Sequence, residues 1–289
     1  MHHFAFLLVS HCRRRKFKTY EEEMESLRGY FHDARLQLSA HPKIAVLTLA
    51  FLAAYELNVL QSAWRKVFVY FEVTFSKKLN AGLRAKKVEL FEPLFRRRDS
   101  SRDGLPLRVV EIGLGGGSNF DFYPDETEVV GVDPNPDYLK YLRRELETTS
   151  GRRVKMVEVV CAGAEKMDEF IAEDSVDAVV ATLVLCTVRD VCAVVTNCRK
   201  VLKPGGVFLF LHHNRADPVA HPWRARLQSW VTPLTYRLGD GCHFNRDPVE
   251  DIQRAGFSKV SYEKYTPPRK NRFAPFSLIH PFLIGCAVK

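Results

Sequence analysis

The sequence predicts an α/β fold built on a mostly parallel sheet and preceded by a separate N-terminal segment. Three observations lead to this prediction. Apolar strand-like segments alternate with helix-like ones from Leu107 onward, a glycine-rich run follows the first of them, and the excess positive charge is confined to the N-terminal third. Such alternation is typical of a parallel sheet with helices on both faces. A chain of 289 residues accommodates one such domain with an appendage, or two domains at most.

The expected strands are short apolar segments, which are typical of a buried sheet. They are Leu107–Ile112, Glu128–Val132, Val157–Val160, Ala178–Ala181 and Val207–Leu211. Two further strands, Phe257–Glu263 and Leu283–Val288, flank the proline-rich stretch 266–281 and are expected to close the sheet as an antiparallel hairpin. Helices are expected at Asp137–Leu146 and at about 190–202, where a Lys-Pro-Gly-Gly run forms the stop signal.

Composition and charge exclude several classes of protein. Hydrophobic residues make up 46% and charged residues 27% of the chain, which is ordinary globular usage and excludes wholesale disorder, collagen and a multi-spanning membrane protein. Residues 1–108 hold 20 Lys and Arg against 11 Asp and Glu, whereas residues 109–289 hold 23 of each. A nucleic-acid partner is therefore not expected, and the basic segment is expected to face an anionic surface. Seven cysteines, an odd number without a C-x-x-C pair, predict neither a disulfide scaffold nor a metal site, and a reduced, cytosol-facing setting is the simpler interpretation.

The N-terminal third divides into an extension and an apolar, aromatic and basic region. The run that opens the chain is too short, and has its charges on the wrong side, for a cleaved signal. Residues 44–60 are apolar at a borderline length for a span, and Trp64–Phe75 is aromatic with Lys and Arg around it, a composition that suits a membrane interface. We predict an extension of unassigned role at 1–42, a helical membrane-associated anchor with a linker at 43–104, and the main domain at 105–289. The alternative is a cover helix packed on the main domain.

The glycine-rich run and a distant acid indicate a site for an adenosine-containing cofactor. Glu111 and Gly113, Gly115 and Gly117 follow the first strand, and Asp133 closes the second. Glycines let the backbone approach a ligand closely, and an acid in that place accepts ribose hydroxyls in dinucleotide folds. The nicotinamide pattern G-x-G-x-x-G fails at its third glycine, which disfavours an oxidoreductase.

The pattern E-x-G-x-G-x-G, with V-D-P at the second strand and L-K-P-G-G before the fifth, resembles the class I S-adenosylmethionine-dependent methyltransferases. Longer stretches are similar to one family, the methyltransferase-like protein seven family of membrane-associated thiol S-methyltransferases, over about residues 43–289. These stretches are Asn119–Pro124, Val132–Pro136, Thr182–Cys186, Arg199–Gly206, Asp240–Cys242 and Gly285–Lys289.

The resemblance implies a Rossmann-like class I methyltransferase fold with S-adenosyl-L-methionine as cofactor. It also implies anchoring to the endoplasmic reticulum or lipid droplets, with the catalytic domain in the cytosol. The sequence departs from the family in two places: the glycine loop reads Gly-Leu-Gly-Gly-Gly at 113–117 where the family has G-C-G-T-G, and His212-His213 stands where the family has Glu-His. The second departure faces the presumed substrate side and bears on substrate identity.

The candidate site residues follow from their places at strand ends. The candidate cofactor residues are Glu111, Gly113, Gly115, Gly117, Asp133, Ala164, Glu165 and Leu183. Glu111 is expected either to orient the cofactor's ammonium or to hold loop amides, and the backbone near Ala164 to meet the adenine. The candidate catalytic residues are His212 and His213, since histidine acts as a base near neutral pH, although either could instead be structural. Cys186 and Cys242 are candidate pocket residues, for which small buried hydrophobes are the simpler interpretation.

Methyl transfer to sulfur requires little of the protein beyond alignment and a dry pocket, because a thiol is already partly ionised near neutral pH. We therefore expect transfer to small lipophilic thiols. The alternatives are another lipophilic acceptor, such as a quinone or a lipid, and a non-catalytic membrane or lipid-droplet module that keeps the fold.

Overall fold

The computed structural model describes residues 42–56, 61–100, 104–148, 153–268 and 278–289. The chain divides into two units, and the boundary falls between Phe68 and Val69. The second unit holds all of the sheet and both candidate site regions.

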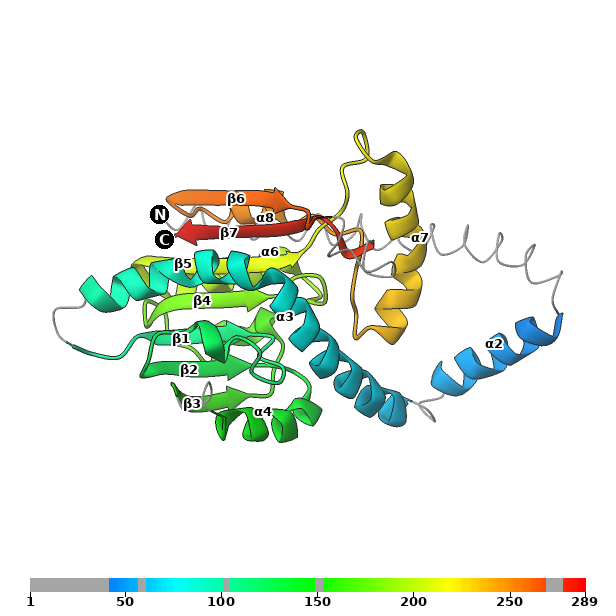
Figure 1. The fold of residues 1–289 in the computed structure, drawn as a ribbon, viewed down its shortest axis with the longest axis horizontal. Coiled ribbons are helices and arrows are strands. Elements are labelled where there is room, and N and C mark those ends of the chain that lie inside the picture. Colours follow the sequence, from blue (N-terminus) through cyan, green and yellow to red (C-terminus); the bar gives the residue numbers. More distant parts are fainter. Residues whose placement is uncertain (1–41, 57–60, 101–103, 149–152, 269–277) are drawn as a thin grey trace. The chain divides into compact units, whose positions relative to one another are not determined.

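A seven-stranded sheet with the order β3-β2-β1-β4-β5-β7-β6 forms the second unit (Figure 1). All strand pairs are parallel except those that β7 makes with β5 and β6. This arrangement confirms the predicted mostly parallel sheet with antiparallel closure. The strand order reverses between β1 and β4, which is where open α/β sheets bind their ligands. The strands are β1 (Arg108–Ile112), β2 (Thr127–Val132), β3 (Val154–Val160), β4 (Val176–Thr182), β5 (Leu202–His213), β6 (Lys259–Tyr265) and β7 (Phe282–Val288).

The fifth strand is longer than predicted. It begins at Leu202, which pairs with Val176, and the register then jumps so that Val207 pairs with Ala178. The Lys-Pro-Gly-Gly run lies in this irregular stretch, where Gly205 has a φ of +72°. Proline and glycine therefore mark a bulge here and not only the end of the preceding helix.

Helices cover both faces of the sheet, as predicted. Buried side chains of α6 (Val191–Val201) and α8 (Val249–Arg254) join one core with Phe208 and Phe210 of β5. The opposite core takes Leu209 and Leu211 of the same strand. The structure also describes η1 (Phe120–Phe122), η2 (Pro136–Tyr138), α4 (Leu139–Leu146), η3 (Ala164–Glu169) and α7 (Pro222–Leu238) in this unit. The alternation of even and odd residues places the two faces of β5 in two separate cores.

The predicted linker and domain boundary need correction. Helix α3 (Gln61–Ser100) continues through most of the stretch 96–104 that was predicted to be a linker, and the compact unit begins at Val69 instead of 105. The helix persists because Leu90, Phe91 and Leu94 lie on one face and are buried in the core beside the sheet. The charged residues that suggested a linker lie in its last turns, where cations favour the helix dipole. This part of α3 therefore packs on the main domain.

The other N-terminal helix is α2 (Pro42–Glu56). Within the parts of the chain that the structure describes, no helix has both the length and the apolar character that crossing a bilayer requires. The predicted extension 1–42 lies almost wholly outside the described residues.

Candidate active site

The glycine loop and Asp133 form one hydrogen-bonded unit at the carboxyl ends of β1 and β2. Gly115 N donates to Asp133 Oδ2 at 2.9 Å, and Asn135 N donates to Oδ1 of the same carboxylate, also at 2.9 Å. Gly113 has a φ of +68°, and a Cβ there would lie 2.5 Å from the side chain of Val184. The loop therefore needs glycine for its backbone conformation and for its contact with the segment after β4.

The carboxylate of Asp133 keeps capacity for a ligand. Burial raises the pKa of Asp133, while the hydrogen bonds from Asn135 and Gly115 lower it. An ionised carboxylate offers about four acceptor positions, and two are used by these amides. This leaves acceptor positions for hydroxyl groups.

Glu111 lies under the loop and is bound by protein groups. Asn119 Nδ2 and the Tyr123 hydroxyl each donate to its carboxylate at 2.7 Å. Burial raises the pKa of Glu111 to about 7. The carboxylate thus connects the residues at both ends of η1 to β1.

A buried lysine extends this network to helix α3. Lys87 Nζ donates to Asn119 Oδ1 and, at 2.6 Å, to Asn80 Oδ1. Burial lowers the pKa of Lys87 to about 7. Sequence reasoning missed Lys87 because it stands among four other cations between 77 and 87 that have no such burial.

Helix α3 also adds an acid beside Asp133. Burial raises the pKa of Glu72 to about 7; a hydrogen bond with Tyr138 lowers it, and the nearby Asp133 and Asp240 raise it further. Three carboxylates from α3, β2 and the loop after α7 therefore lie within electrostatic reach of one another. Such a group favours a cationic ligand. The available sequence signal for Glu72 is a single acid within an otherwise apolar and aromatic stretch.

The structure places the remaining predicted cofactor residues in different settings. Gly117 has a φ of +83°, and a Cβ there would meet Phe120 at 2.7 Å. Leu183, with a φ of +56°, follows β4 next to Val184, which packs on Gly113. Ala164 is part of a hydrophobic core. The Glu165 carboxylate accepts Arg189 N at 2.6 Å, so it supports the turn before α6.

The two candidate catalytic histidines point to opposite faces of the sheet. His212 pairs with Leu283 and His213 with Phe282, and these partners belong to the two different cores. His212 is fully buried, and burial lowers its pKa to about 3, so the imidazole is neutral. The structure therefore separates the pair, and only His213 shares a face with Leu183 and Leu211.

His213 lies against two cysteines. Its Nε2 is 3.1 Å from Cys242 Sγ, and its ring meets Phe244 edge-on. A hydrogen bond with Cys242 and the neighbouring His213 charge lower the pKa of the buried Cys186 thiol, whereas that of Cys242 is raised. The structure thus unites three of the residues singled out from sequence, each from a different part of the chain.

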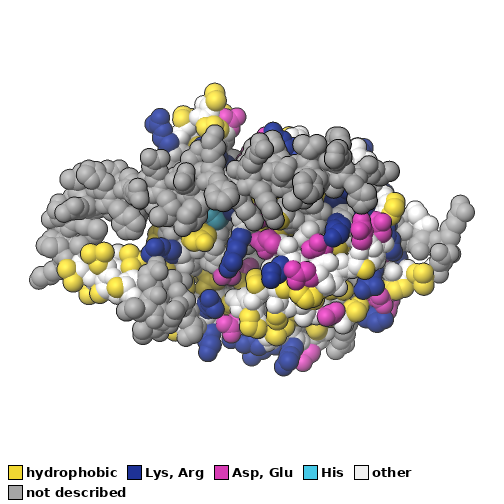
Figure 2. Space-filling model, turned by 180° about the vertical axis from the view of Figure 1, so that it is seen from behind, with side chains coloured by type: hydrophobic (Ala, Val, Ile, Leu, Met, Phe, Trp, Pro, Cys, Tyr) yellow, Lys and Arg dark blue, Asp and Glu magenta, His cyan; other side chains and the backbone are white. Residues whose placement is uncertain are grey.

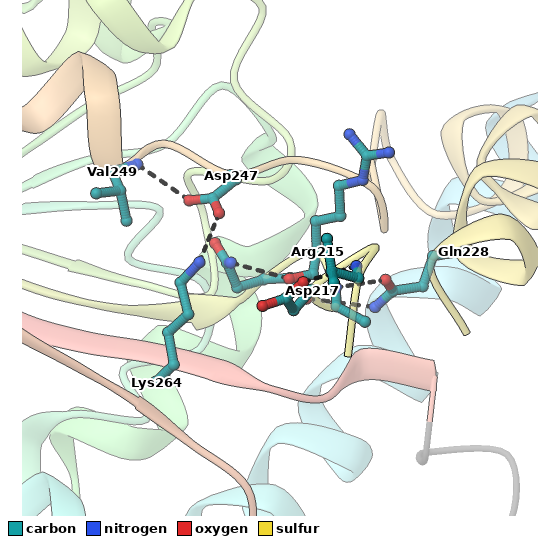
Figure 3. Close-up of polar contacts among 9 residues, drawn as sticks. Arg215, Asp217, Gln228, Asp247, Val249 and Lys264 are labelled. Atoms are coloured by element: carbon teal, nitrogen blue, oxygen red, sulfur yellow. Dashed lines mark hydrogen bonds and ion pairs between the residues drawn. The ribbon is translucent and has the colours of Figure 1, made fainter. Parts of the chain in front are cut away.

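A polar network fixes the loop that follows His213 (Figure 3). Gln228 of α7, labelled in the figure, accepts from Ala216 N at 2.7 Å. It also donates to Leu278 O at 2.8 Å. Farther along, Asp247 accepts from Val249 N at 3.2 Å and pairs with Lys264 of β6 at 2.7 Å. These bonds tie α7 and the loop before α8 to the closing strands. The segment after β5 is therefore fixed by hydrogen bonds and an ion pair that involve α7 and β6.

Comparisons with known proteins agree with this arrangement. Residues 110–210 match the model of a methyltransferase domain. The chain is 32% identical over 255 residues to thiol S-methyltransferase TMT1B of Rattus norvegicus, covering 86% of this chain and 98% of the relative. It is 34% identical over 225 residues to thiol S-methyltransferase TMT1A of Homo sapiens, covering 78% and 87%. The solved CurJ carbon methyltransferase is similar in fold, with a TM-score of 0.52 at 14% identity over 75% of this chain and 58% of that chain.

Proposed function

Since the chain belongs to the thiol S-methyltransferase family, we propose that it transfers the methyl group of S-adenosylmethionine to the sulfur of small lipophilic thiols. The observation that carries the proposal is the bond from Gly115 N to Asp133 Oδ2, which joins the glycine loop to the acid at the sheet's switch point. The acceptor assignment rests on the names of the relatives and on the His213 end of β5.

The residues at the strand ends fit S-adenosylmethionine. The donor carries a positive sulfonium and an ammonium group, and Glu72, Asp133 and Asp240 lie close enough to influence one another's charge. Asp133 would accept the ribose hydroxyls, and Gly113, Gly115 and Gly117 would leave room for the donor along the loop. Leu183 would pack beside the adenosine, and the backbone at Ala164 and Glu165 would meet the adenine.

Bound S-adenosylmethionine supplies an electrophilic methyl group, and the chain supplies alignment and a water-poor surface. His213 ends β5 on the same face as Leu211, where the thiol would approach the methyl group. Phe244, Phe282 and Leu211 surround this end of the strand with apolar surface. Moving an apolar thiol from water to this surface therefore costs little free energy. Its sulfur becomes more nucleophilic when the thiol loses its proton.

The test is an assay of purified full-length protein with methyl-labelled S-adenosylmethionine and a panel of alkyl and aryl thiols. Mass spectrometry is expected to find the label in methyl thioethers. Alcohols and amines on the same carbon skeletons serve as matched acceptors and are expected to remain unlabelled. Label only on oxygen or nitrogen would contradict the thiol assignment, and no label on any acceptor would contradict the enzyme assignment.

We further propose that the protein works at the cytosolic face of the endoplasmic reticulum membrane or on lipid droplets, attached through its N-terminal helices. Helix α2 leaves Val46, Leu47, Leu49 and Phe51 largely exposed, and Figure 2 shows hydrophobic side chains gathered along it. Exposed apolar surface of this kind is typical of a membrane-interaction site. A lipophilic acceptor is concentrated in the same phase.

Flotation with phosphatidylcholine and phosphatidylserine vesicles tests the attachment. Full-length protein is expected to float with the vesicles, and Leu47→Glu is expected to shift protein to the soluble fraction. Val219→Glu, at an exposed valine outside α2, is the matched control. Equal flotation of Leu47→Glu and the wild type would contradict attachment through α2.

A further inference from the structure

Cys186, His213 and Cys242 form a compact cluster of metal-ligating side chains. Cys186 follows β4, His213 ends β5, and Cys242 lies in the loop after α7. One ligand atom from each lies within 4.8 Å of the other two, and His213 Nε2 is 3.1 Å from Cys242 Sγ. Three distant parts of the chain thus bring two thiols and one imidazole to a single point.

The cluster's backbone is fixed by hydrogen bonds that do not involve its side chains. His243 N donates to Cys186 O at 2.9 Å, and the Thr235 hydroxyl donates to Cys242 O at 2.9 Å. Arg246 Nη1 donates to Leu185 O at 2.9 Å, next to Cys186. When the surroundings already hold the ligands of a site in place, little conformational entropy is lost as an ion binds.

The cluster places a polar ring in a buried position. His213 is buried, and its Nδ1 has no hydrogen-bond partner among the described residues. The cysteine Cys198 provides a contrast, since it is buried entirely among apolar side chains as a small hydrophobe. The cluster is not a plain apolar core position.

We propose that Cys186, His213 and Cys242 bind one Zn²⁺ ion and leave its fourth position open. Tetrahedral zinc with bonds of about 2.3 Å to sulfur and about 2.0–2.1 Å to nitrogen separates its donor atoms by about 3.5–3.8 Å. The cluster's ligand atoms lie within 4.8 Å of one another, and the 3.1 Å between His213 Nε2 and Cys242 Sγ would lengthen by a few tenths of an ångström on binding. Two cysteines, one histidine and an open position are one of the ligand sets found in catalytic zinc sites. The spacing of the cysteines in the sequence predicts no such site, because the three ligands come from separate elements.

The open position gives the ion a role that rests on the proposed thiol methylation. The acceptor sulfur binds there as a thiolate and releases its proton to solvent. Its lone pair forms the new bond to the methyl carbon while the bond from that carbon to the sulfonium sulfur breaks. The products are the methyl thioether and S-adenosylhomocysteine. In this arrangement His213 is a ligand and not the proton acceptor.

Metal binding is measured on the full-length protein without S-adenosylmethionine or thiol. After treatment with reductant and chelator and desalting, the protein is dialysed against Zn²⁺ or Co²⁺. We expect one equivalent of zinc by plasma mass spectrometry and, for cobalt, the thiolate charge-transfer and tetrahedral ligand-field absorption bands. Cys186→Ser, Cys242→Ser and His213→Gln are each expected to weaken binding at least about tenfold, the lower end of what a second-shell change costs.

Cys161→Ser, which removes an exposed cysteine outside the cluster, is the matched control and is expected to bind like the wild type. Circular dichroism identifies any cluster variant that fails to fold. In that case, the cobalt spectrum of the wild type alone shows whether the thiolates bind the metal. The absence of a stoichiometric metal in the wild type, a cobalt spectrum without thiolate bands, or a Cys186–Cys242 disulfide in the reduced preparation would overturn the proposal. Bound zinc without thiol methylation would contradict the proposed function and leave the metal site standing.

Discussion

The two halves of the sheet's carboxyl edge differ in how their polar groups are satisfied. At the ends of β1 and β2, the carboxylates of Asp133 and Glu111 are both hydrogen-bonded to nearby groups. At the end of β5, by contrast, both ring nitrogens of His212 and Nδ1 of His213 have no partner among the described residues. The first half is organised for a donor before anything binds. The second half buries ring nitrogens that have no partner among the described residues.

The largest expected effect comes from removing Asp133. Asp133→Ala deletes the acceptor of two loop amides and the proposed ribose ligand. Hydrogen bonds to a charged group contribute about 1.5–3 kcal/mol each, so the affinity for S-adenosylmethionine is expected to fall about 10³-fold. Calorimetric titration measures the loss. Asp125→Ala, at an exposed carboxylate paired with Arg153, is the control and is expected to bind normally; equal losses in both variants would mean that Asp133 has no specific role.

Replacing His213 tests the other half of the edge. His213→Gln is expected to lower kcat for thiol methylation about 100-fold, because it removes one ligand of the proposed zinc site that would hold the thiolate, while the KM for S-adenosylmethionine changes little. Steady-state kinetics with both substrates varied separate the two effects. If His213→Gln raised the KM for the donor as Asp133→Ala does, the two halves would not be functionally distinct.

The buried carboxyl Glu111 is expected to impose a pH dependence on stability. Burial raises its pKa from 4.5 to about 7, so between these values the folded state binds more protons than the unfolded state. Its contribution to stability is therefore present below about pH 4.5 and lost as the pH rises to 7, with a total on the order of 3 kcal/mol.

Urea denaturation of wild type and Glu111→Gln at pH 5 and pH 7 measures this effect. The variant keeps its side-chain acceptor and is expected to lose less stability over that interval than the wild type does. Glu72→Gln is the companion variant, because the pKa of Glu72 is raised to about the same value by burial. Parallel pH profiles for Glu111→Gln and wild type would show that Glu111 is ionised throughout.

The smallest expected effect concerns His212, the histidine on the opposite face. His212→Leu replaces a buried imidazole, whose ring nitrogens have no partner among the described residues, by an apolar side chain of similar volume. Removing unsatisfied buried polar atoms is expected to stabilise the fold by about 1 kcal/mol, and thermal unfolding measures it. Destabilisation of several kcal/mol would show that His212 has a polar partner.

Features formed by residues close together in the chain could be predicted from the sequence. The glycine loop and Asp133 belong to consecutive elements, and adjacent parallel strands necessarily bring their carboxyl ends together, so this half of the site could be predicted from spacing. The parallel order and the antiparallel closure follow in the same way from the alternation of apolar segments.

The other features of the site depend on contacts between distant elements and could not be predicted from the sequence. Glu72 and Lys87 reach the site because α3 packs on the sheet, and Cys186 meets Cys242 because α7 returns the chain to the end of β4. The predicted linker failed for the same reason, since burial of Leu90, Phe91 and Leu94 outweighs the local preference of a polar, charged stretch. Local pattern encodes strands, turns and periodic faces, whereas contacts between distant elements depend on packing free energy summed over the whole core.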